Sequence, residues 1–111
     1  MHLTLIPTLP RPEDFIAAFG CEAARDEDEV QVCVFEDAAG GRAIMTFGAV
    51  DRTFSLSVYQ GGAETLRVSD SQLGGVAIVC GGVEARLGVG AAIRTLTLTL
   101  HPFIAVSIAP G

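Results

Sequence analysis

This sequence of 111 residues has no tryptophan, no lysine and no asparagine, and it has one tyrosine and two histidines. Binding sites for carbohydrate and single-stranded nucleic acid depend on exposed aromatic rings, so the shortage of rings argues against both. The net charge of −6, with seven scattered arginines, also disfavours nucleic acid and anionic membrane surfaces. We therefore expect neither a nucleic acid nor a membrane as partner.

Residues that perform catalysis are equally scarce. His2 lies at the chain end, and the spacing of His101 from the cysteines does not indicate a nucleophile with its base. The acidic run Asp26–Glu29 lacks the alternation and the central glycine of a calcium loop. The glycine-rich run Gly81–Gly90 lacks the Gly-Lys-Ser/Thr ending of a phosphate-binding loop. The sequence predicts a protein that is not an enzyme and that has no metal site and no cofactor.

The three cysteines, Cys21, Cys33 and Cys80, are separated by 12 and 47 residues, spacings that match no zinc or redox motif. Free cysteines are among the most buried residue types, so we expect buried or half-buried free thiols. A disulfide between two of the three is the alternative.

The chain also lacks a run of about 20 apolar residues, which is the length needed to cross a bilayer. The Met1 end has no basic stretch followed by an apolar run, so we expect no secretory signal and a cytoplasmic location. Compact domains most often have about 100–150 residues, and we therefore expect a single domain over residues 1–111.

What the sequence does contain is a series of short alternating segments, clearest between Arg42 and Val68. Phe54, Leu56 and Val58 alternate with polar residues, which is typical of a strand with one buried face. Gly61-Gly62 supplies the positive φ angles of a tight turn. The pattern predicts three consecutive strands over Ala43–Ala49, Thr53–Gln60 and Ala63–Val68.

One helix is predicted over Pro12–Phe19. Proline suits the first turn of a helix, the acidic pair after it favours the helix N-terminus, and Gly20 marks the end. The segment 21–29 reads as an acidic loop, and the remainder, 30–109, as β-rich. In addition to the central meander we expect strands at His2–Ile6, Val30–Glu36, Val76–Cys80 and Val83–Val89, a loop at Ser69–Gly75, and a bulge or close backbone approach near Gly88 and Gly90.

The C-terminal part shows the strictest alternation in the chain, with leucines at 96, 98 and 100 against threonines at 95, 97 and 99. We expect Leu96, Leu98 and Leu100 to be buried. Because Pro102 alone separates this run from Phe103–Ala109, we expect one long strand with a corner at His101-Pro102. The fold class is mainly β with one short N-terminal helix: a largely antiparallel meander of about eight strands that forms a sandwich or an open barrel.

Negative charge is concentrated in one third of the chain. Residues 1–37 hold nine acids and two arginines, a net of −7, whereas residues 38–111 have a net of +1. Concentrated charge steers an oppositely charged partner toward a surface. We therefore predict a partner-binding surface of seven carboxylates and the one tyrosine, which lies on the polar face of its strand: Glu22, Asp26, Glu27, Asp28, Glu29, Glu36, Asp37 and Tyr59. The alternatives are a solvated loop for the charge run and cross-strand packing for the tyrosine.

These features favour a small, acidic, non-enzymatic domain that binds a basic protein. Inhibitors and toxin-neutralising immunity proteins share this physical character. The alternatives are a β-barrel that holds an apolar small molecule and a structural or self-assembling subunit. A cavity above about 300 Å³ would favour the barrel. A homodimer through a sheet edge is a further expectation.

Overall fold

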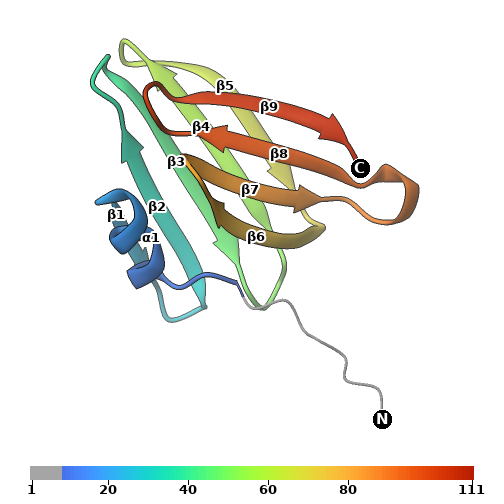
Figure 1. The fold of residues 1–111 in the computed structure, drawn as a ribbon. Helices are drawn as coiled ribbons and strands as arrows, with labels where there is room; N and C mark the ends of the chain where they lie inside the picture. The colour runs from blue at the N-terminus through green and yellow to red at the C-terminus, as the bar shows by residue number, and fades with distance from the viewer. Residues whose placement is uncertain (1–8) are drawn as a thin grey trace.

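The computed structural model describes residues 9–111, so the strand expected at His2–Ile6 lies outside the described residues. The described chain folds into two antiparallel sheets and a short helix (Figure 1). Its elements are α1 (Pro12–Phe19), β1 (Glu22–Arg25), β2 (Val30–Glu36), β3 (Gly41–Gly48), β4 (Phe54–Gln60), β5 (Ala63–Asp70), β6 (Leu73–Val79), β7 (Gly82–Leu87), a 3₁₀ turn (Gly90–Ala92), β8 (Arg94–Thr99) and β9 (Ala105–Pro110).

The two sheets have the strand orders β1-β2-β3-β4-β5 and β6-β7-β8-β9. Within each sheet, strands that follow one another in sequence pair, and the chain passes from the first sheet to the second between β5 and β6. The predicted fold class, mainly antiparallel β with one early helix, is confirmed. Because the strands divide into two separate sheets that face each other, the arrangement is a sandwich (Figure 1).

Helix α1 has the predicted bounds. Pro12 and the acidic residues Glu13 and Asp14 form its first turn, and the Asp14 carboxylate accepts a hydrogen bond of 2.8 Å from the Arg11 backbone N–H. Gly20 ends the helix in the left-handed conformation, at φ 64°, which glycine adopts without steric cost. A helix of only eight residues is not stable alone, so its position depends on packing.

That packing is made by phenylalanine rings. Phe15 is completely buried, and its ring centroid lies 6.5 Å from that of Phe35 and 5.9 Å from that of Phe47. Phe19 makes an edge-to-face contact with Phe35, with centroids 5.8 Å apart. Helix α1 therefore covers the inner face of the first sheet over β1 and β2, and the Phe15 ring reaches β3 at Phe47.

The second sheet covers the rest of that inner face. Phe54, Leu56 and Val58 of β4 are buried and alternate with half-buried residues, as predicted. Leu96 and Leu98 of β8 are also buried, whereas Leu100 is half-buried because it follows the end of the strand. The alternation expected for β8 is confirmed, with its threonines on the opposite face.

The segment predicted as an acidic loop, 21–29, is only partly a loop. Glu22–Arg25 forms β1, an edge strand that pairs with β2, and only 26–29 is a turn. Ala23 and Ala24 have low β-propensity and show no alternation, so the sequence alone does not indicate a strand here. The strand forms because it pairs with β2, and such pairing can outweigh intrinsic propensity. The loop predicted at Ser69–Gly75 is also shorter, because β5 continues to Asp70 and β6 begins at Leu73.

The single long strand predicted around His101-Pro102 is wrong. β8 ends at Thr99 and β9 begins at Ala105, and the two pair antiparallel as a hairpin. Residues 100–104 form the loop, which is long enough to reverse the chain. Near Gly88 a close backbone approach is present, since a Cβ there would collide with the Ala92 carbonyl oxygen, but the bulges lie in the β4–β5 and β6–β7 pairs.

Replacing Leu98 with alanine is expected to lower the free energy of unfolding by about 2–5 kcal/mol, because the substitution leaves a cavity where a fully buried side chain packs. Urea denaturation followed by circular dichroism measures the loss. Ile108→Ala is the matched control, since Ile108 is 43% exposed and its removal should cost much less. Equal losses for the two variants would contradict the position of the core.

Candidate functional site

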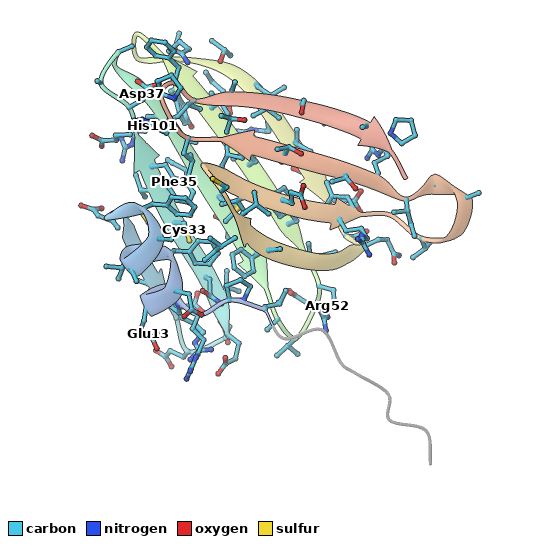
Figure 2. All side chains as sticks on the ribbon, in the orientation of Figure 1. Glu13, Cys33, Phe35, Asp37, Arg52 and His101 are labelled. Carbon is cyan, nitrogen blue, oxygen red and sulfur yellow. The ribbon has the colours of Figure 1, made fainter. Side chains whose placement is uncertain are left out.

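Four strand connections meet at one end of the sandwich. Gly41 pairs with Gln60, which places the β2–β3 and β4–β5 turns together, and Gly82 pairs with Thr99, which does the same for the β6–β7 and β8–β9 connections. Figure 2 shows Asp37 and His101 at this end and Glu13 and Arg52 at the opposite end.

The eight residues predicted as one partner-binding surface are divided between these two ends. The β1–β2 turn, which carries Asp26–Glu29, lies at one end of β2, and Glu36 and Asp37 lie at the other. Glu22 pairs with Val34 and therefore lies toward the Asp37 end. The charge run that is continuous in sequence is thus not one patch in space.

Within the β1–β2 turn the four acids have different roles. The Asp26 carboxylate accepts hydrogen bonds from the backbone N–H groups of Asp28, at 2.9 Å, and Val30, at 3.1 Å, so it closes the turn. Glu29 adopts φ 62° and forms an ion pair of 3.2 Å with Arg25. The side chains of Glu27 and Asp28 are exposed and belong to no ion pair among residues 9–111.

Two further acids, not included in the predicted surface, lie near this turn. The buried Gln31 side chain donates a hydrogen bond of 2.7 Å to the carbonyl oxygen of Pro10, which holds the start of α1 beside the start of β2. Glu13 and Asp14, in the first turn of α1, therefore lie at the same end as the β1–β2 turn (Figure 2). We call the resulting group of six carboxylates the acidic end: Glu13, Asp14, Asp26, Glu27, Asp28 and Glu29.

Arg11 and Arg25 lie on the two segments, 11–14 and 25–29, that carry these six carboxylates, and Arg52 lies at the same end of the sandwich (Figure 2). The sequence places Glu13 and Asp14 on a helix but does not say which end of β2 that helix approaches. The hydrogen bond between Gln31 and Pro10, which are 21 positions apart, fixes where the helix begins, and no local sequence pattern predicts this bond.

Asp37 has a structural role at the other end. Its carboxylate accepts hydrogen bonds from the backbone N–H groups of Gly41, at 2.6 Å, Ala39, at 3.0 Å, and Ile104, at 2.9 Å. The bond from Ile104, followed by the bond from Gly41, lowers the pKa of Asp37 below its usual value. Since Ile104 precedes β9, this carboxylate joins the first sheet to the second.

Tyr59 is half-buried rather than fully exposed. It lies opposite Arg42 in the β3–β4 pair and lines a groove of about 560 Å³ together with Glu36 and Asp37. The structure therefore brings three of the predicted residues, Glu36, Asp37 and Tyr59, to one groove.

A larger cleft, of about 680 Å³, opens at the same end between α1 and the second sheet. Phe19, Phe35 and Leu100 contribute to its apolar part, and its further lining includes Glu22, Glu36, Cys21, Cys80 and His101. The cleft exceeds the volume that would speak for a small-molecule carrier, but it lies at the end of the sandwich and not within the packed core between the sheets. The cleft is therefore not the barrel interior that a carrier of an apolar small molecule would require.

The three cysteines are free and differ in exposure. Cys33 is buried, Cys21 is half-buried, and Cys80 is exposed, which the sequence did not predict. Burial raises the pKa of Cys33 to about 12, and the nearby Cys21 thiol adds to the rise. Burial also raises the pKa of Cys21. Although Cys80 and His101 line the same cleft, no hydrogen bond joins them in the described part of the chain.

Residues 9–111 contain no group of three or more His, Cys, Asp or Glu side chains placed to hold a metal ion. None of the helices described here is long and apolar enough to cross a membrane.

No protein-family model matches this chain, and no curated protein sequence does. A solved structure does resemble it: a chain of the "Contact-dependent growth inhibition toxin - immunity protein complex from Klebsiella pneumoniae 342" superposes with a TM-score of 0.78. The likeness covers 96% of this chain and 98% of that chain, at 14% sequence identity. The two chains therefore share a fold over nearly their whole lengths.

Alkylation of the native protein with a small thiol reagent should modify Cys80 first, Cys21 more slowly, and Cys33 only after unfolding. The thiolate is the reacting species, so both burial and a raised pKa slow the reaction. Mass spectrometry of digested samples measures the three rates. Modification of Cys33 as fast as Cys80 in folded protein would contradict the described packing.

Asp37→Asn should destabilise the protein at neutral pH, because an amide nitrogen replaces one of the two accepting oxygens. The folded pKa of Asp37 is lowered, so its contribution is present above the unfolded pKa and is lost as the pH falls through the folded pKa. The stability difference between wild type and variant should therefore shrink in acid. Urea denaturation at a series of pH values tests this, and a constant difference would refute the role of the charge.

Proposed function

We propose that this chain is an immunity-type protein: a non-enzymatic domain that binds and neutralises a protein toxin. The observation that carries the proposal is the shared fold with a chain of a toxin–immunity complex, which extends over 96% of this chain.

The acidic end is proposed as the surface that meets the partner. Its carboxylates come from two segments that the fold brings together, and Glu27 and Asp28 project without ion-pair partners within the described residues. Such a surface attracts a basic protein and accelerates its association, an effect that salt weakens. The proposed partner is therefore basic.

Glu36 and Tyr59 offer a second, smaller contact region at the opposite end. They line a groove with Arg42, and Glu36 also borders the larger cleft. Asp37 is not proposed as a contact residue, since its carboxylate is already engaged by three backbone N–H groups.

The direct test uses the product of the gene adjacent to the one that encodes this chain. Expression of that neighbour in a bacterial host should arrest growth, and co-expression of this chain should restore it. The purified proteins should also form a complex in size-exclusion chromatography. A toxic neighbour that neither binds this chain nor is neutralised by it would overturn the proposal.

A charge variant tests the acidic end. The double substitution Glu27→Gln with Asp28→Asn is expected to slow association with the toxin about 3- to 10-fold at low salt and to reduce its salt dependence. Asp26 and Glu29 stay unchanged because they shape the turn. Stopped-flow or surface plasmon resonance measurements over a salt series give the rates.

The control is Glu64→Gln with Glu84→Gln, which removes the same number of charges from exposed positions on β5 and β7. Glu64, unlike Glu27 and Asp28, is paired with an arginine, Arg67, at 2.9 Å. Its association rate should change much less. If the control slows association as much as the test variant, the steering comes from net charge and not from the acidic end.

A further inference from the structure

Strand β9 is an edge strand without charged side chains or a bulge, and its one proline, Pro110, is its last residue. Its sequence, Ala-Val-Ser-Ile-Ala-Pro, has no charged side chain, and the described residues place no strand on its outer side. The other edges differ, because β1 and β5 carry charged side chains and the register of β6 shifts between Leu73 and Gly75. Charges and bulges are the common means of preventing strand addition, so β9 is the edge open to it.

Exposed apolar features lie at both ends of this strand. Phe103, just before β9, is 59% exposed. At the other end lies a largely apolar groove of about 610 Å³, lined by Val89, Ile93, Ile108 and Pro110, and Val89 is 61% exposed. The ion pair between Arg94 and Asp70 also borders this groove. A large ring at one end and an apolar groove at the other are complementary features of one edge.

We propose that two copies of this chain associate through β9, paired antiparallel around a two-fold axis at Ser107. Antiparallel pairing of a strand with itself places residues opposite each other in a fixed order. An axis at Ser107 pairs the residues of Ala105–Ala109 with one another and leaves Pro110, which has no N–H, outside the ladder. Ile108, 43% exposed in one copy, then lies opposite Val106 of the second copy.

The same register joins the two apolar features. With residue 107 opposite residue 107, position 103 of one copy lies opposite position 111 of the other. Phe103 of each copy therefore lies beside the end of β9 in the second copy, next to the groove that Ile108 and Pro110 line there. Because of the two-fold symmetry this contact forms twice, and it covers both exposed features at once.

The distribution of charge favours the same edge. Each chain has a net charge of −6, so two copies repel each other most where their acids are dense. Figure 1 shows β9 on the side away from α1 and the β1–β2 turn, which carry the acidic end. This inference goes beyond the proposed function, since self-association requires no toxin.

Analytical ultracentrifugation of the purified protein tests the dimer. The average mass should rise from the 11.5 kDa of one chain toward twice that value as concentration increases into the millimolar range. Phe103→Ser should weaken the association at least several-fold. Val50→Ser is the matched control, since Val50 is 77% exposed in the β3–β4 turn, and this variant should associate like wild type.

Cross-linking tests the register. In a Cys80→Ala background, which removes the exposed thiol, Ser107→Cys should form a disulfide-linked dimer under mild oxidation. Ala105→Cys should not, because in the proposed register it lies opposite Ala109 and far from its own counterpart. Both positions are exposed, and circular dichroism verifies that the variants fold.

A protein that stays monomeric at every concentration overturns the proposal, as does equal dimerisation of wild type and Phe103→Ser. Faster cross-linking at 105 than at 107 overturns the register. None of these results bears on toxin neutralisation, which is measured in separate growth and binding experiments.

Discussion

The inner face of the five-stranded sheet must be covered along its whole width, and the other features of the molecule depend on how this is done. The second sheet has only four strands and leaves the region over β1 and β2 to α1. Phe15 is completely buried there. The contacts of this one buried ring hold the eight-residue helix in place. They thereby fix the direction of the helix and the end of the sandwich at which its first turn lies.

That direction determines where the charge gathers. The first turn of α1 is acidic, as suits a helix N-terminus, and packing brings it to the β1–β2 turn, which is acidic for other reasons. The Asp26 carboxylate closes the turn through its hydrogen bonds, whereas the side chains of Glu27 and Asp28 belong to no ion pair among the described residues. Carboxylates without a structural task are the ones free to act on a partner, and the fold distinguishes them from Asp26 and Asp37.

The sequence predicts the parts of this structure that local patterns determine. The bounds of α1 and β2 follow from capping residues and alternation, and the central meander follows from its turns. It fails where pairing with another strand decides the outcome: the Ala-Ala pair of β1 becomes a strand because β2 lies beside it, and β9 turns back to pair with β8, with Ile104 bound to the distant Asp37. The predicted site has the same limit, since residues of one acidic segment of the sequence, such as Glu29 and Glu36, lie at opposite ends of β2.

Asymmetry of charge gives the two proposed surfaces different physical characters. The acidic end offers long-range attraction to a basic protein and repels a second copy, whereas β9 offers only short-range backbone and apolar contacts and no charge. Added salt weakens the first kind of contact and, by screening the repulsion between copies, favours the second. A rise in salt concentration should therefore shift the protein from binding a basic partner toward self-association, because the two surfaces respond in opposite directions to the same screening.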